Sequence, residues 1–95
     1  MRVIIKKSVK SEKKMMAIFY EGDKKVKTTH FGSAGMEDFT KTRDIQQKQR
    51  YIARHKKNEN WGKYMTAGSL SRYILWNLPT KQASILNYKK RFNLQ

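Results

Sequence analysis

The chain has 95 residues, the size of one small domain, and leaves no room for a catalytic domain beside a regulatory one. It carries 22 lysines and arginines against 7 aspartates and glutamates, a formal net charge of +15. The absence of cysteine excludes disulfides, thiolate zinc sites and thiol nucleophiles. Because no long apolar run is present, we expect an intracellular protein, neither secreted nor inserted in a membrane.

The hydrophobic fraction of 38% is below that of a typical globular protein. Together with the high net charge, it brings the chain near the composition of disordered proteins. Two tryptophans, five tyrosines, four phenylalanines and a single proline argue for a folded core instead. Apolar residues also recur in short periodic blocks that turn signals separate. We therefore predict one folded domain over residues 1–95.

Alternating apolar residues predict a three-stranded antiparallel meander over about residues 2–31. In the first strand, three apolar residues would share one side: Val3, Ile5 and Val9. In the run Met15–Tyr20, alternate side chains would face opposite sides of the sheet. The turn Glu21–Lys24 joins this strand to a third, because Gly22 tolerates positive φ and Asp23 can bond its own backbone.

Helical periodicity takes over after a glycine loop at residues 32–43. We predict helices over about residues 45–57, 69–77 and 80–92, with Asp44, Ser69 and Thr80 as their N-caps. Strands followed by helices indicate an α+β fold, with about three helices packed on one face of the sheet.

The first predicted helix has a basic side. At 100° per residue, Arg50, Arg54 and Lys57 fall together, away from an apolar side that is formed by five residues: Ile45, Lys48, Tyr51, Ile52 and His55. Positive charge also occurs in every predicted block except residues 32–40 of the glycine loop, so it is a property of the whole surface. A field of this kind attracts polyanions, of which nucleic acid is the obvious one.

The predicted phosphate contacts are the basic residues in and around this helix: Arg43, Lys48, Arg50, Arg54, Lys56, Lys57 and Lys63. Trp61 and Tyr64 are the aromatic residues that we expect to remain exposed and to stack on bases. The alternative is a solvated helix face that only keeps a small protein soluble. A second basic group flanks the first turn and could either contact phosphate or guard an edge strand: Lys6, Lys7, Lys10, Lys13 and Lys14.

Catalytic chemistry has weak support in the sequence. A metal-dependent nuclease could be assembled from His30, Asp38 and Asp44, but no recognised spacing holds these residues together. We expect instead that His30 and His55 are structural, that no metal or cofactor is bound, and that the protein is not an enzyme. The segment Gly32–Gly35 lacks the Gly-Lys-Ser/Thr ending of a phosphate-binding loop and is interpreted as a turn.

Several strings over residues 14–93 carry a resemblance to a known family: Ala17-Ile18-Phe19-Tyr20, Gly22–Gly32, Gly35, Asp38-Phe39-Thr40, Arg50–His55, Asn58–Trp61, Thr66-Ala67-Gly68, Leu75-Trp76-Asn77 and Pro79-Thr80. The chain resembles a family of small, basic, functionally uncharacterised proteins encoded by large DNA viruses of algae and protists. The resemblance implies no activity. It implies a viral product in the nucleus or cytoplasm of an infected host and a place in the virion, where it would neutralise DNA or cement a capsid.

Charge and resemblance together predict a non-enzymatic protein that binds nucleic acid, DNA rather than RNA, without regard to sequence. A basic helix face would neutralise the phosphates. The alternative function is a minor virion component that binds acidic protein surfaces. The sequence leaves the oligomeric state open.

Overall fold

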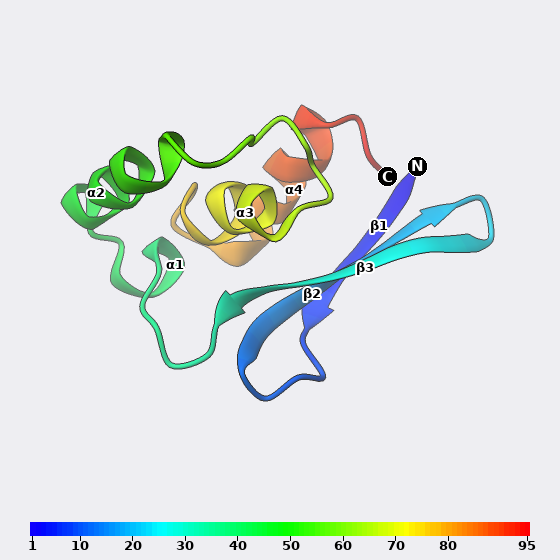
Figure 1. Ribbon diagram of the computed structural model, residues 1–95, viewed down its shortest axis with the longest axis horizontal. Helices are drawn as coiled ribbons and strands as arrows, with labels where there is room; N and C mark the ends of the chain where they lie inside the picture. Colours follow the sequence, from blue (N-terminus) through cyan, green and yellow to red (C-terminus); the bar gives the residue numbers. More distant parts are fainter.

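The computed structural model describes residues 1–95 and has an α+β fold, in which an open antiparallel sheet is followed by helices on one side of it (Figure 1). The strands are β1 (Arg2–Lys7), β2 (Lys13–Glu21) and β3 (Lys24–Ser33), with β2 in the middle. The helices are α1 (Phe39–Thr42), α2 (Ile45–Lys56), α3 (Ala67–Leu70), the π-helical turn η1 (Ser71–Leu75) and α4 (Lys81–Arg91). None of these helices is long and apolar enough to cross a membrane.

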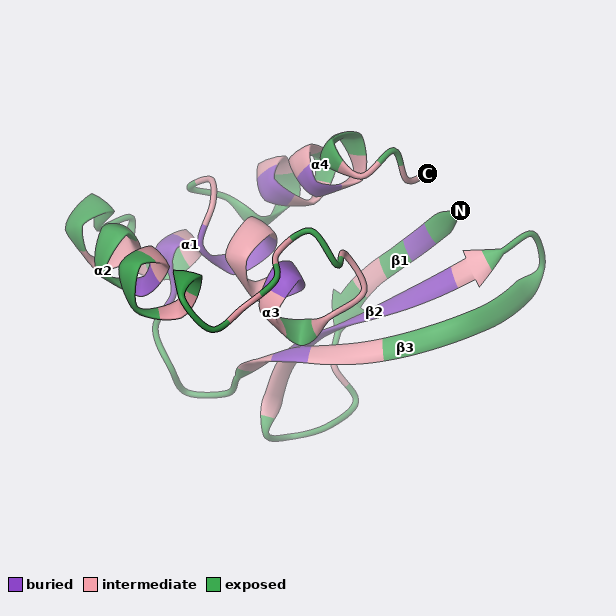
Figure 2. Ribbon diagram, turned by 45° about the horizontal axis from the view of Figure 1, so that its top comes forward, coloured by how far each residue is buried: buried purple, intermediate pink, exposed green.

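Alternation along β2 divides the sheet into a helix-covered face and an outer face, as its sequence predicts. Met15, Ala17 and Phe19 belong to the hydrophobic core, whereas Met16 and Ile18 lie on the other face and outside that cluster. The core is completed by residues from both layers: Val3, Phe31, Phe39, Tyr51, Leu70, Ile74, Leu75, Trp76 and Tyr88. Figure 2 shows this buried band along β2 and the helices above it.

The first strand is shorter than the alternation of its apolar residues predicts. β1 ends at Lys7, and Val9 lies in the following loop with 81% of its surface exposed. The reason is a local turn at Ser8, whose amide donates to the carbonyl of Lys14 while its hydroxyl accepts from the amide of Lys10. The chain is thereby turned away from the sheet before Val9 can join it.

The outer edge of β1 meets the end of the chain. The amide of Val3 donates to the carbonyl of Gln95 over 2.9 Å, and the amide of Gln95 donates to the carbonyl of Met1 over 3.0 Å. The two termini accordingly lie side by side in Figure 1. These bonds satisfy backbone groups that an edge strand would otherwise leave unpaired.

The predicted glycine loop at 32–43 contains a helix that the sequence analysis missed. α1 begins after Asp38, whose carboxylate accepts from the amide of Thr40, and ends at Arg43, which adopts the left-handed conformation with φ 54°. One turn of helix is too short to show a 3.6-residue period, so only its cap could have revealed it.

The helix predicted for residues 69–77 begins two residues earlier, with α3 at Ala67, and ends two residues earlier, with η1 at Leu75. Thr66, not Ser69, is the N-cap, because its hydroxyl accepts from the amide of Ser69. The hydroxyl of Ser69 donates instead to the carbonyl of Trp61. The last turn widens, with the amide of Trp76 donating five residues back to Ser71.

The other two helices are confirmed within a residue of their predicted ends. Asp44 caps α2 by accepting from the second and third amides beyond it, and Thr80 caps α4 by accepting from the amide of Ala83. On α4, Tyr88 is fully buried while Ile85 and Phe92 pack against the core, so these residues at i, i+3 and i+7 form the inner side of the helix. Ile45, which the helical register places on the apolar side of α2, is 62% exposed and does not pack against the core.

Gly32 is required where β3 passes under η1. Its φ is +78°, and a Cβ atom there would lie 2.7 Å from the Cδ1 atom of Leu75. We expect Gly32→Ala to lower the free energy of unfolding by about 2–4 kcal/mol, from left-handed strain plus overpacking. Gly35→Ala is the control, since Gly35 has φ +83° but nothing within 4 Å. It should lose only the strain, about 1 kcal/mol. Urea denaturation measures both variants, and equal losses would contradict the close approach to Leu75.

Candidate nucleic-acid interface

One side of α2 is attached to the body of the protein by a stack of rings. The ring of Tyr51 lies parallel to that of Trp76, with centroids 4.4 Å apart and 7° between the planes. The ring of His55 also stacks on that of Tyr51, with centroids 4.2 Å apart and 26° between the planes. Burial raises the pKa of Tyr51 to about 12, so its hydroxyl stays protonated. The stack sets which side of α2 can face outward.

Lys48 belongs to this attached side and does not act as a free surface cation. Its ammonium donates to the backbone carbonyl of Asn77 over 2.6 Å and lies 4.9 Å from the ring centroid of Phe39. Burial, together with the nearby guanidinium of Arg72, lowers the pKa of Lys48. The structure therefore separates Lys48 from the other predicted phosphate contacts.

The opposite flank of α2 carries the cations that the helical register groups together. Arg50, Arg54 and Lys57 are all exposed, and none of them makes an ion pair. Figure 2 shows α2 as a largely exposed ribbon at one end of the molecule. We call these three residues the α2 flank. Lys56, the next predicted contact, is exposed on an adjacent side of the helix.

Two predicted contacts lie outside α2. Arg43 is exposed at the bend between α1 and α2, and Lys63 is exposed in the segment between α2 and α3. Neither makes an ion pair. Both are accessible, but they come from separate segments and do not continue the register of the α2 flank.

Trp61 is half-buried, contrary to the expectation that it remains exposed. Its indole N–H donates to Oε2 of Glu59 over 2.7 Å, and its backbone carbonyl accepts from the hydroxyl of Ser69. The guanidinium of Arg72 lies 5.4 Å from its ring centroid. The tryptophan fastens the loop after α2 to α3, and the guanidinium of Arg72 lies over its ring.

Tyr64 is likewise part of the packed interior. Its ring meets Phe19 edge-on at 5.9 Å and Phe92 at 5.6 Å. Its backbone carbonyl accepts a short hydrogen bond from the hydroxyl of Tyr88. Tyr64 thus contributes to the packing around the core, as expected in a domain poor in aliphatic residues, and its stacking on a base stays a prediction.

Ion pairing leaves nearly all of the positive charge uncompensated. The structure has two ion pairs, Lys14 with Asp38 at 2.5 Å and His55 with Glu59 at 3.5 Å. Of the 22 lysines and arginines, one is thus paired and 21 are not. A surface of this kind repels itself and attracts polyanions at any ionic strength that leaves it unscreened.

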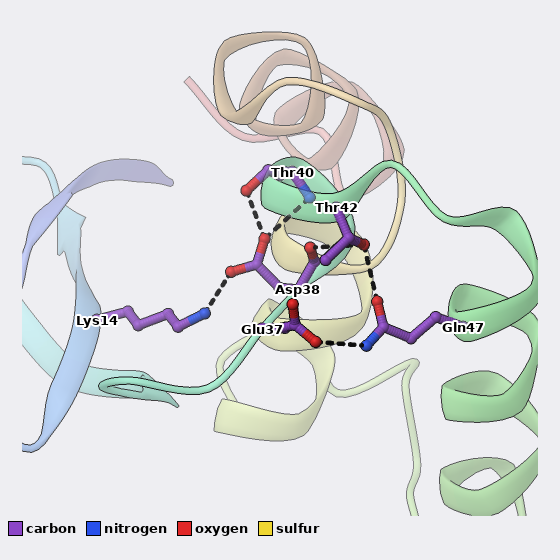
Figure 3. A network of polar contacts seen from close by, with 6 residues as sticks. All are labelled: Lys14, Glu37, Asp38, Thr40, Thr42 and Gln47. Carbon is purple, nitrogen blue, oxygen red and sulfur yellow. Dashed lines mark hydrogen bonds and ion pairs between the residues drawn. The ribbon is translucent and has the colours of Figure 1, made fainter.

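The Lys14–Asp38 pair is buried and connects the sheet to the helices (Figure 3). The side chain of Lys14 is 8% exposed and that of Asp38 only 1%. Burial by itself would raise the pKa of Asp38. Hydrogen bonds from Lys14 and from the amide and hydroxyl of Thr40, with the lysine charge, outweigh burial and hold that pKa below its usual value.

The network continues from Asp38 to α2. The hydroxyl of Thr42 donates to Oε1 of Gln47 over 2.7 Å, and the amide group of Gln47 donates to Glu37 over 3.4 Å (Figure 3). These contacts fix where α2 leaves α1. The orientation of the α2 flank therefore depends on the buried pair.

A cavity of about 380 Å³ opens beside this network, between the end of the sheet, α2 and α3. Its charged lining is mixed, with Lys13, Lys14, Arg54 and His55 facing Glu37, Asp38 and Glu59. Carboxylates inside the cavity oppose a polyanion. Arg54 belongs to both the cavity lining and the α2 flank, and because its side chain is exposed we place the candidate interface on the outer side of α2 and not in the cavity.

The residues of the nuclease alternative have separate structural partners. Nδ1 of His30 lies 2.7 Å from the hydroxyl of Ser8, Asp38 is paired with Lys14, and Asp44 caps α2. No group of three histidine, aspartate or glutamate side chains lies close enough to hold a metal ion. The geometry gives this constellation no common site.

Two features of the site escaped the sequence analysis. The Lys14–Asp38 pair joins residues 24 positions apart, and only the capping pattern of Asp38 before Phe39-Thr40 gave a local signal. Arg72 is half-buried with its Nε atom unpartnered, while one Nη donates to the carbonyl of Trp76 over 2.9 Å. Nothing in its sequence neighbourhood distinguishes it from an exposed arginine.

Comparison with known proteins assigns this chain to a family of unknown function, DUF5754, whose sequence pattern matches residues 3–55. The chain belongs to that family. The matched segment spans all three strands, α1 and nearly all of α2, including the Lys14–Asp38 pair and Arg50 and Arg54 of the α2 flank. No curated protein and no solved structure matches the chain.

We expect the buried pair to make the folding stability acid-dependent. The pKa of folded Asp38 lies below its ordinary value of 3.8, so the stabilisation is present above that value and is lost as the pH falls through the lowered pKa. Asp38→Asn leaves the Lys14 ammonium buried without a counter-charge. It should lower the free energy of unfolding at neutral pH by about 3 kcal/mol.

Urea denaturation between acid and neutral pH tests both statements. The difference in stability between the natural chain and Asp38→Asn should be constant at neutral pH and shrink below about pH 4. A difference that persists unchanged into acid would contradict the ionised pair.

Proposed function

We propose that this member of a family of unknown function binds nucleic acid through phosphate contacts of the α2 flank and does not read base sequence. One observation carries the proposal: Arg50, Arg54 and Lys57 share an outward flank, and no carboxylate pairs with them. The opposite side of the same helix is held by the Tyr51 stack, so the flank is presented rigidly. The backbone that carries these cations is therefore already ordered, and binding has to immobilise only their side chains.

The spacing and chemistry of the flank suit a phosphate backbone. Side chains three and four positions apart on a helix are neighbours on its surface, with Cβ atoms about 5–6 Å apart. Arg50 and Arg54 have guanidinium groups, which can donate two parallel hydrogen bonds to one phosphate, and Lys57 adds a point charge. Duplex DNA presents a negative charge about every 1.7 Å along its axis, so such a row can contact several phosphates.

Burial of the aromatic residues supports recognition without base reading. Tyr64 packs against the core, and the indole N–H of Trp61 is bonded to Glu59, so contacts within the domain hold both side chains. Contacts made by arginine and lysine to the backbone position a protein on nucleic acid but carry no sequence information. We propose DNA as the ligand in preference to RNA, and only the resemblance to viral proteins supports this preference.

The alternative that the charge only maintains solubility accounts less well for the structure. Solubility requires a net charge of magnitude about 2–8 for a small domain, and signs can be interspersed. This chain carries +15 and pairs one of its lysines and arginines. The unpaired positive charges repel one another, and no contact inside the folded domain offsets this repulsion. A bound polyanion would relieve it.

Binding to two unrelated short duplexes tests the proposal. We expect similar affinities for both, and a logarithmic salt dependence whose slope corresponds to several phosphate contacts. The variant R50Q/R54Q/K57Q should weaken binding and reduce the slope by about 0.9 for each contact removed. Fluorescence anisotropy titrations over a range of salt concentrations give both quantities.

The matched control is K24Q/K25Q/K27Q, which removes three exposed lysines from the hairpin end of β3 and the same net charge. It should change affinity much less than the α2 variant. Binding that is absent or insensitive to salt in the natural chain would reject the proposal. Equal losses in the two variants would show that net charge acts without the α2 flank.

A further inference from the structure

A second basic surface lies away from the α2 flank. It is a hollow of about 590 Å³ between the loop after β1, the turn after β3, and the first turns of α1 and α4. We call it the lysine hollow. Its lining comes from four segments of the chain: the loop after β1 with the start of β2, the turn after β3, α1 and α4.

The lining contains six lysines and no aspartate or glutamate. Lys14 is neutralised by Asp38. The ammonium groups of the other five take part in no ion pair or hydrogen bond of the structure: Lys7, Lys10, Lys13, Lys41 and Lys81. The hollow therefore gathers unpaired cations around one space, which distinguishes it from the mixed-charge cavity beside α2.

The positive surface continues beyond the hollow. A smaller neighbouring depression of about 330 Å³ shares Lys41 and Lys81 with it and adds Arg43 and Thr80. No carboxylate lines this depression either. Lys41 and Lys81 thus join the two depressions into one continuous basic surface.

Protection of a sheet edge does not account for this arrangement. Lysines near β1 could guard an edge strand against aggregation, which would explain Lys7, Lys10 and Lys13. Lys41 and Lys81 come from helices and guard no edge. Lys81 even occupies the first position of α4, where the helix dipole disfavours a cation. Their convergence with the loop lysines calls for a ligand.

We infer that the lysine hollow binds the backbone of a single-stranded nucleic acid. The inference deepens the proposed function, because it names a ligand class for a second surface. A volume of about 590 Å³ has the size of a pocket for a small ligand or one stretch of flexible chain. A duplex carries its phosphates on a rigid outer surface and cannot enter such a hollow, whereas a flexible strand can.

The lining also indicates what part of the strand is recognised. No aromatic residue lines the lysine hollow, so bases find no stacking partner there. Lysine ammonium groups are compact, mobile point charges that follow phosphates without demanding a fixed geometry. The hollow therefore tracks phosphates and tolerates any base sequence.

The test compares two variants that lose the same charge. K10Q/K13Q/K41Q/K81Q removes four cations from the hollow, and K24Q/K25Q/K27Q/K90Q removes four exposed lysines from other surfaces. The probes are a fluorescent oligothymidylate and inorganic tripolyphosphate, a chain of phosphates without bases. Titrations over a range of salt concentrations give affinity and salt slope, and circular dichroism confirms that each variant folds.

We expect the hollow variant to lose at least about tenfold in oligothymidylate affinity and about 0.7 in salt slope for each phosphate contact removed. Tripolyphosphate should compete for the same site. The control variant should lose much less. Equal losses in the two variants would overturn the inference, and so would binding of tripolyphosphate without binding of oligothymidylate.

Failure of this inference is distinguishable from failure of the proposed function. The variant R50Q/R54Q/K57Q should lose duplex affinity and keep its affinity for oligothymidylate. The hollow variant should lose oligothymidylate affinity and keep its affinity for the duplex. If the hollow variant retains oligothymidylate binding while duplex binding still depends on the α2 flank, the inference falls and the proposed function stands.

Discussion

The ion pair between Lys14 and Asp38 is the contact on which the relative placement of sheet and helices depends. It joins the middle strand to the cap of α1, with both side chains almost fully removed from water. Charges in such a place are tolerated only when hydrogen bonds satisfy them, and Thr40 supplies two to the carboxylate. The bend at Arg43 and the cap of α2 follow directly, so the direction of α2 is set from this point.

Few of the seven acidic side chains neutralise a lysine or an arginine. Four of the seven acidic side chains are engaged in internal contacts: Glu37 with Gln47, Asp38 with Lys14, Asp44 at the cap of α2, and Glu59 with Trp61 and His55. These acids hold segments in place and, except for Asp38, leave the lysines and arginines unpaired. Even if all seven carboxylates were paired, 15 of the lysines and arginines would have no partner, so the positive surface follows from composition. The internal use of these acids leaves it still less compensated.

Sequence reasoning succeeded where the signal is local. Alternation gave both faces of β2, and the caps Asp44 and Thr80 gave the starts of α2 and α4. It failed where a side chain meets a distant partner. Lys48 reaches a carbonyl 29 positions away, and Tyr64 packs on a strand and on α4 at once. Neither contact leaves a trace in the spacing of neighbouring residues, which is why an exposed and an enclosed cation look the same in the sequence.

The two basic surfaces differ in shape, and shape determines which polyanion each can meet. The α2 flank is an exposed ridge whose two arginines suit fixed phosphates on a rigid support. The lysine hollow is concave and lined by mobile ammonium groups, which suit a chain that can bend into it. Both surfaces belong to one folding unit, so an anion that relieves repulsion at either one stabilises the same native state. The binding proposed for either surface would therefore raise the stability of the whole domain.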